Sequence, residues 1–183
     1  MSVIAFKQFA DRIEVAADGI CLMNDEICSN NFKKIIQITD ELIIGVTGLA
    51  NTTSIFEEFA RANRVVFEKI KTRNEYLRFG KRIKDYLIEN YGYSEETFED
   101  AGGFFIANKY YHGMMYFDDH LSPYIVGEES NAEAFGTTRT YTTALLDIGF
   151  SLEDAIKKSA EKYNSINGNV TLLTINYTNE TRT

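Results

Sequence analysis

The spacing of apolar residues along this chain of 183 residues changes several times between a strand-like and a helix-like period. The order of these segments limits the possible folds. The first 48 residues read as short, closely spaced strands, which is typical of antiparallel hairpins. Two segments with helical spacing follow, strands return, two further helices come next, and one strand ends the pattern. Two stacked sheets, each covered by a helix pair, would satisfy this order, although another α+β packing would satisfy it as well.

The same pattern predicts the individual elements. The predicted strands cover residues 3–9, 12–17, 32–38, 42–47, 104–108, 114–117, 124–126 and 170–175. The predicted helices cover 55–70, 76–87 and 140–148, and a fourth helix begins after the cap residue Ser151. The acidic stretch 92–100 is predicted to be a solvated loop. Because nothing in the chain marks a linker, residues 1–183 are expected to form a single domain.

The charge of the chain excludes several classes of partner. Its 27 acidic and 19 basic residues give a formal net charge of −8 at pH 7. A nucleic acid or an anionic membrane surface needs a basic face, so we expect neither as a partner. No signal peptide opens the chain, and no apolar run reaches the roughly 20 residues of a membrane span. We therefore expect a cytoplasmic protein.

No metal or cofactor is expected from the motifs. Cys21 and Cys28 are too few for a disulfide framework, and their spacing does not fit a zinc site. The residues at 117–120 include ligand-type side chains, but no second ligand pair has suitable spacing. A hydrolase that pairs a cysteine with His112 or His120 lacks any local signature.

Three early segments carry a family resemblance. Ser-Val-Ile-Ala-Phe at 2–6, Val-Ala-Ala-Asp-Gly at 15–19 and Asn-Phe-Lys-Lys at 31–34 resemble proteasome β-type subunits, and most nearly the HslV-like peptidases. The match resumes at 42–48 and returns more weakly at 134–137 and 151–173. The resemblance implies a four-layer αββα sandwich, the fold of the N-terminal nucleophile hydrolases, for this α+β chain. It also implies hydrolysis of peptide bonds without a cofactor.

Ser2 matches the nucleophile of that family, which is the first residue of the mature chain and is usually threonine. Removal of Met1 would expose the Ser2 α-amine. A hydroxyl is a weak nucleophile that needs a base, and an α-amine has a pKa of about 7.7–8.0. One residue can therefore supply both the attacking oxygen and the base.

Two charged residues match the family's buried pair. Lys34 matches the active-site lysine, whose positive charge would lower the pKa of the Ser2 amine and hydroxyl. Asp18 matches the carboxylate that keeps this lysine charged and oriented. In the predicted strand, Lys34 and Phe32 share one face while Lys33 takes the other. Without the resemblance, both residues would be read as ordinary surface charges.

Three further positions complete the implied catalytic set. Gly48 matches the residue whose backbone N–H forms the oxyanion hole, although it would also suit an ordinary turn. Thr137 lies where relatives carry a serine, but Thr138 and Arg139 follow it instead of a glycine. Asn164 and Asn167 take the places of the aspartate and the serine in a family Asp-x-x-Ser-Gly stretch. An amide at 164 cannot supply the negative charge of a carboxylate.

An apolar substrate pocket is implied by the same comparison. Its expected lining residues, which would equally suit a plain core, are Cys21, Phe32, Ile36, Val46 and Ala50. Such a lining would favour an apolar residue before the cleaved bond.

Assembly and partners follow from the family. Relatives enclose their sites in rings, so we expect a ring-forming homo-oligomer, with unfolded polypeptide as substrate and an ATPase unfoldase as a further partner. Two alternatives remain open: a non-catalytic structural ring subunit, which Asn164 and the stretch after Thr137 favour, and a small-amide acylase of the same superfamily.

Overall fold

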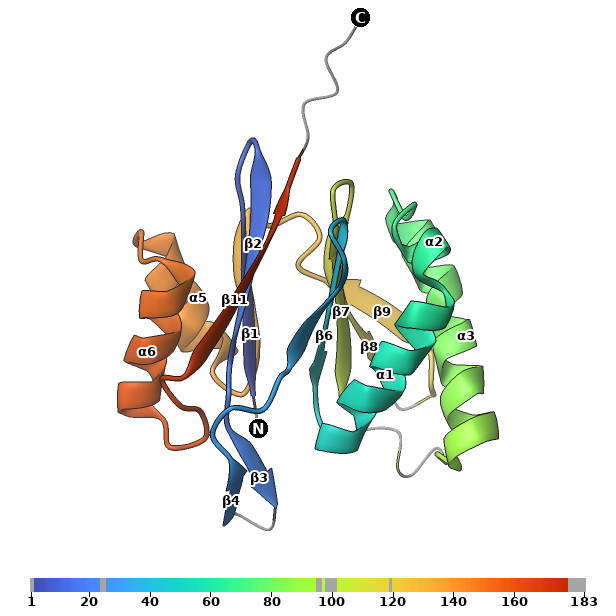
Figure 1. Cartoon of the computed structure of the whole chain (residues 1–183), viewed down its shortest axis with the longest axis horizontal. Helices are drawn as coiled ribbons and strands as arrows, with labels where there is room; N and C mark the ends of the chain where they lie inside the picture. Colours follow the sequence, from blue (N-terminus) through green and yellow to red (C-terminus); the bar gives the residue numbers. More distant parts are fainter. Residues whose placement is uncertain (1, 24–25, 95–96, 98–101, 119, 178–183) are drawn as a thin grey trace, which may run out of the picture.

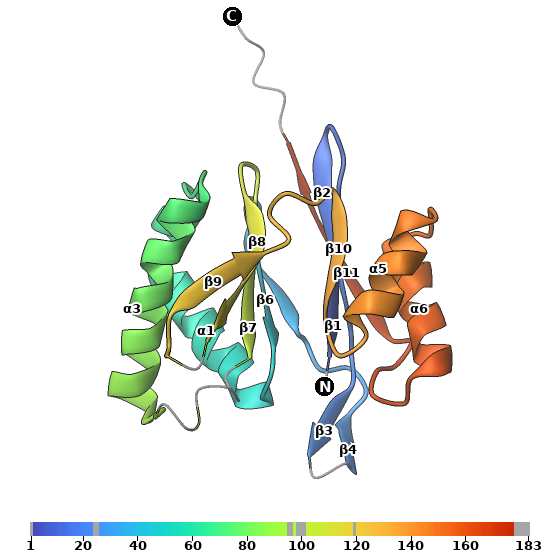
Figure 2. The same cartoon turned by 180° about the vertical axis from the view of Figure 1, so that it is seen from behind.

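The strands of the protein form two antiparallel sheets that pack face to face, and helices cover the outer side of each sheet (Figures 1 and 2). The computed structural model describes residues 2–23, 26–94, 97, 102–118 and 120–177. The resulting order of layers is helices, sheet, sheet, helices. This arrangement confirms the predicted α+β, four-layer αββα sandwich.

The first sheet, which we call the N-terminal sheet, has the strand order β10-β1-β2-β11. Its strands are β1 (Val3–Gln8), β2 (Arg12–Asp18), β10 (Ala132–Gly136) and β11 (Val170–Asn176). Helices α5 (Arg139–Asp147) and α6 (Leu152–Lys162) cover its outer face (Figure 1).

The second sheet, which we call the central sheet, has the order β5-β6-β7-β8-β9. Its strands are β5 (Ile35–Thr39), β6 (Leu42–Thr47), β7 (Gly103–Asn108), β8 (His112–Phe117) and β9 (Pro123–Val126). Its covering helices are α1 (Ala50–Ala62), α2 (Arg64–Phe67) and α3 (Arg73–Tyr91). A separate hairpin of β3 (Cys21–Met23) and β4 (Glu26–Ser29) projects beyond the sandwich at the end where the chain begins (Figure 1).

Three apolar clusters hold the four layers together. The cluster between the sheets includes Phe6, Phe105 and Phe135, which are fully buried and whose ring centroids lie 5.9 Å apart in each pair. A second cluster joins the central sheet to α1, α2 and α3, and a third joins the N-terminal sheet to α5 and α6. Because every layer buries an apolar face, hydrophobic burial is the main force that fixes their order.

Local signals define the helix ends. At the start of α3 the side chain of Thr72 accepts from the N–H of Glu75 while the Glu75 carboxylate accepts from the N–H of Thr72, which forms a capping box. The helix ends at Gly92, whose φ of 68° suits glycine. The predicted cap of α6 is confirmed, since the Ser151 hydroxyl accepts from the N–H of Asp154 at 3.1 Å.

The sequence predictions differ from the structure in several places. The predicted helix 55–70 is divided into α1, which ends at Ala62, and α2, which ends at Phe67. The hairpin β3–β4 was not predicted because its two strands are very short, and strand β10 was not predicted because the strand that pairs with it, β1, lies far away in the chain. Strand β5 begins at Ile35, so Phe32 and Lys34 precede it and do not share a strand face. The predicted acidic loop at 92–100 lies mostly outside the described residues.

Among the helices of the described residues, none combines the length and the apolar character that crossing a bilayer requires.

The interface between the sheets should dominate stability. Replacing Phe105 with Ala removes a fully buried ring and leaves a cavity, so we expect a loss of about 3–5 kcal/mol in the free energy of unfolding. Urea denaturation measures the change. Ile148→Ala, at a residue that is 74% exposed, is the control and should change stability by less than about 0.5 kcal/mol. Equal losses in the two variants would contradict this assignment of the core.

Candidate active site

A buried ion pair lies at the end of the two sheets where the chain begins. The Nζ atom of Lys34 donates to both carboxylate oxygens of Asp18, at 2.7 and 2.8 Å. The backbone N–H groups of Val3 and Ile20 donate to the same carboxylate, at 2.8 and 3.1 Å. Asp18 therefore accepts four hydrogen bonds from three donor groups, and its buried charge is compensated.

The pair is almost completely removed from solvent. Asp18 is 1% exposed and Lys34 is 4% exposed, whereas the neighbouring Lys33 is exposed. Burial lowers the pKa of Lys34 below its ordinary value, and the nearby charge of Asp18 opposes this shift. Of the two adjacent lysines only Lys34 is buried, and this difference does not arise from alternation along a strand.

The end of β10 and the residue after it position the backbone of Ser2. Its carbonyl oxygen accepts from the N–H of Thr137 at 2.9 Å, just beyond the end of β10. Gly136 has a φ of 96°, and a Cβ atom there would lie 2.1 Å from the Ser2 oxygen. Only glycine allows this close approach, so the sequence Gly136-Thr137 holds the Ser2 backbone in place.

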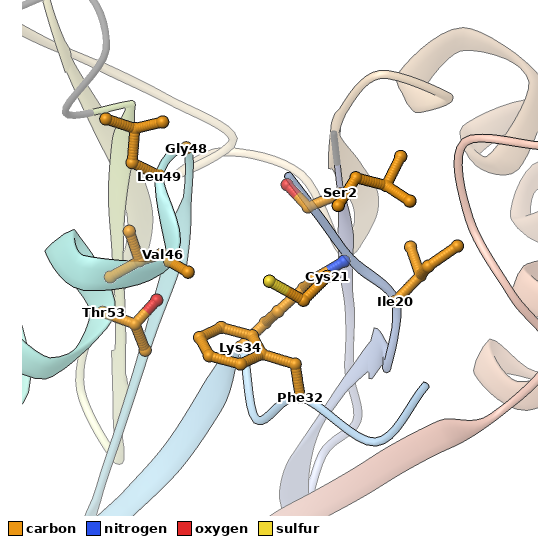
Figure 3. A pocket seen from close by; sticks show the side chains of 11 residues that line it. Ser2, Ile20, Cys21, Phe32, Lys34, Val46, Gly48, Leu49 and Thr53 are labelled. Atoms are coloured by element: carbon orange, nitrogen blue, oxygen red, sulfur yellow. The ribbon is translucent and has the colours of Figure 1, made fainter. Parts of the chain in front are cut away.

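Ser2 and Lys34 line one cavity of about 90 Å³ at the gap between the sheets. Figure 3 shows Ser2 and Cys21 on one side, Val46 and Thr53 on the other, and the amine of Lys34 pointing toward Ser2 and Cys21. The remaining lining residues come from the start of β3, from the segment before β5 and from the junction of β6 with α1. They are Ile20, Leu22, Phe32, Gly48, Leu49 and Ala50.

Gly48 lies at the junction of β6 and α1. Its φ of 149° is a conformation that residues with a side chain rarely adopt. The first turn of α1 follows, and Leu49 at its N-cap makes no side-chain cap. Backbone N–H groups at a helix start favour negative charge, so this wall of the cavity can stabilise an anion.

The structure separates some of the predicted residues from this cavity. Ile36 packs toward α1 and lines a neighbouring groove, because Ile35 takes the face between the sheets and side chains alternate along β5. Thr137 contacts Ser2 through its backbone while the residue as a whole is exposed. Asn164 is exposed after α6, and among the described residues no hydrogen bond joins it to Ser2.

Several residues near the site were not predicted from the sequence. Leu49 and Thr53 line the cavity, and the helical spacing of Ala50 and Thr53 could have indicated that both face it. Asn167, expected as the counterpart of a serine, instead accepts from the N–H of Gly19 at 3.0 Å. Within the described residues, no group of three His, Cys, Asp or Glu side chains is arranged to hold a metal ion.

Comparisons with known proteins agree on the architecture. No protein-family model and no curated protein match the sequence. BPH from Thiobacillus denitrificans is 16% identical, with a TM-score of 0.74 over 97% of this chain and 100% of that chain. The fold is that of the N-terminal nucleophile hydrolases. At the level of fold, the chain is therefore proteasome-like.

Two further solved structures support the same fold. BPH in complex with epoxomicin is 15% identical, with a TM-score of 0.74 over 96% of this chain and 99% of that chain. Eukaryotic HslV from Trypanosoma brucei is 13% identical, with a TM-score of 0.65 over 95% of this chain and 99% of that chain.

The buried pair should be essential for stability. Lys34→Ala leaves the Asp18 carboxylate buried without its cationic partner, so we expect a loss of about 3–5 kcal/mol in the free energy of unfolding. Chemical denaturation measures it, with Lys33→Ala as the adjacent control, expected to change stability by less than about 0.5 kcal/mol. Similar small effects in both variants would show that the pair is dispensable.

The lowered pKa of Lys34 predicts a pH dependence. As the pH rises toward 10.5, the ordinary value for lysine, the folded chain releases this proton before the unfolded chain does. The unfolded state then binds more protons, so this group makes the folded state more stable as the pH rises through that window. The difference in unfolding free energy between the wild type and Lys34→Met should therefore increase with pH. A difference that falls over this range would contradict the direction of the shift.

Proposed function

We propose that the chain is a proteasome-like peptidase in which Ser2, freed by removal of Met1, is the nucleophile. The observation that carries this proposal is that Ser2 and Lys34 line one cavity, with Asp18 buried behind the lysine. The α-amine and the hydroxyl of a first residue can serve as base and nucleophile together. The fold and the resemblance of the first 34 residues support the same reaction.

The reaction would proceed in two steps. The Ser2 α-amine takes the proton from Oγ, which attacks the carbonyl carbon of the peptide bond, and the proton passes to the leaving nitrogen as the C–N bond breaks. An ester between Ser2 and the substrate acyl group remains. Water then attacks this ester, its proton moves through the amine to Oγ, and the acid product leaves.

The surrounding groups would assist both steps. The Lys34 ammonium, held by Asp18, lowers the pKa of the Ser2 amine and hydroxyl through its charge. The N–H of Gly48 and the start of α1 would stabilise the oxyanion of each tetrahedral intermediate. Cys21, Phe32, Val46 and Ala50 border the cavity and would favour an apolar side chain before the cleaved bond.

We further propose that copies of the chain enclose the site in a ring and that unfolded polypeptide is the substrate. An ATPase that feeds such a substrate would act as a separate partner. A chain of 183 residues cannot form a proteolytic chamber alone, so the proposed activity requires assembly.

The alternative is a non-catalytic ring subunit. The exposed amide of Asn164, at the place of a family carboxylate, favours it. A protein that forms rings and has a free Ser2 amine but hydrolyses no peptide would support this alternative against the peptidase.

Loss of the nucleophile should abolish turnover. Intact-mass measurement first establishes whether the mature chain lacks Met1, and a retained Met1 would refute the Ser2 mechanism. A fluorogenic peptide with an apolar residue before the cleaved bond then measures kcat. We expect Ser2→Ala to lower kcat by at least about a thousandfold, because no covalent intermediate can form. Ser122→Ala, at an exposed serine remote from the cavity, is the control, and equal rates in both variants would eliminate Ser2 as nucleophile.

A further inference from the structure

Asn30 meets two asparagines from the far end of the sequence, Asn167 and Asn169, beside the buried ion pair. Asn30 precedes Phe32, and Asn167 and Asn169 lie between α6 and β11, at the end of the sandwich from which β3 and β4 project (Figure 1). The Nδ2 atom of Asn167 donates to the backbone oxygen of Asn30 at 3.0 Å and to its Oδ1 atom at 3.3 Å. Asn169 donates to the same backbone oxygen through its own Nδ2 atom, at 3.0 Å. We call these three residues the asparagine clasp.

The opposite end of the Asn167 amide holds the segment that follows β2. Its Oδ1 atom accepts from the N–H of Gly19 at 3.0 Å and from the N–H of Asn169 at 3.3 Å. Asn167 therefore uses both the donor and the acceptor of its amide, each toward a different backbone segment. A serine has one hydroxyl proton and a shorter side chain, and an aspartate has no donor, so neither can reproduce all four contacts.

Both segments joined by the clasp lead directly into the ion pair. Gly19 follows Asp18, and the Gly19 carbonyl oxygen accepts from the N–H of Phe32, two residues before Lys34, at 2.8 Å. The two segments approach so closely that a Cβ atom on Gly19 would lie 2.6 Å from the backbone oxygen of Asn30. The clasp thus joins the two segments that carry Asp18 and Lys34.

We propose that Asn167 is a positioning residue of the site: through the asparagine clasp it holds the Asp18 and Lys34 segments together, and the ion pair in turn sets the environment of Ser2. This inference rests on the proposed peptidase function. It gives Asn167 a role different from that of the serine expected at its position. Asn167 does not contact the reacting atoms, and its effect passes through Gly19 and Asn30 to the charged pair.

The test compares three variants in the full-length protein. Asn167→Ala removes all four side-chain contacts, Asn30→Ala removes only the 3.3 Å contact because the backbone oxygen remains, and Ser165→Ala alters the same turn as a control. With the fluorogenic peptide, we expect kcat to fall about tenfold in Asn167→Ala while KM stays within about twofold, as for lost orientation. The pH dependence of kcat should also shift in that variant. The effect of Asn30→Ala should be smaller, and Ser165→Ala should match the wild type.

Hydrogen exchange gives a readout that does not depend on activity. The amides of Val3 and Ile20 donate to Asp18, so they should exchange at least about tenfold faster in Asn167→Ala, while the amide of Ile106 in β7 keeps its wild-type rate. Unchanged exchange and unchanged kcat in Asn167→Ala would overturn the proposal. So would equally faster exchange at Ile106, because that indicates general destabilisation.

Two further outcomes are distinguishable. If Asn167→Ala does not fold, Asn167→Ser and Asn30→Ala are measured in its place. The proposal is overturned if the amides of Val3 and Ile20 exchange at the wild-type rate in both of these variants. A wild-type protein that lacks Met1 and shows no turnover refutes the proposed peptidase, whereas the exchange measurement still decides whether the clasp positions the ion pair.

Discussion

The face-to-face packing of the two sheets is the contact on which the rest of the structure depends. Phe6 of the N-terminal sheet stacks with Phe105 of the central sheet, Phe135 packs against Phe105 at a tilt, and the core residues around them are buried. This packing sets the start of β1 opposite the junction between β6 and α1. A cavity exists there because the two sheet ends meet at a gap that Ser2 and Gly48 border from opposite sides.

The ion pair between Lys34 and Asp18 is buried as well, so both of its charges need partners within the protein. A charge removed from water is unfavourable unless it is paired and hydrogen bonded, and the pair meets this condition through its own contacts and two backbone N–H groups. Asp18 is the last residue of β2, whereas Lys34 lies in the loop before β5, so the placement of the pair depends on a loop as well as on a strand. This explains why contacts such as the asparagine clasp, which join segments more than 130 residues apart, lie directly beside it.

Predictions from the sequence were most accurate where local periodicity is strong. Strand β6 was predicted with its observed bounds, and the cap at Ser151 was confirmed. The identity of the buried lysine was also predicted, but for a reason that is wrong in detail, because Lys34 lies before β5 and not within a strand. Its burial results from the loop that brings it to Asp18. The strands of the hairpin β3–β4 carry too few residues for periodicity to reveal them, and β10 is held in the sheet by β1 from the other end of the chain.

The counterparts near the C-terminus show a different limit. In the sequence, Asn164 and Asn167 are equally plausible as residues of the site. In the structure, Asn164 is exposed, whereas Asn167 bridges two segments of the site. The sequence by itself determined most of the order of the elements, because apolar spacing is a local property, and the resemblance of its early segments implied the layers. Only the tertiary structure decided which polar residues meet around Ser2, because those meetings depend on loop paths and on contacts between distant segments.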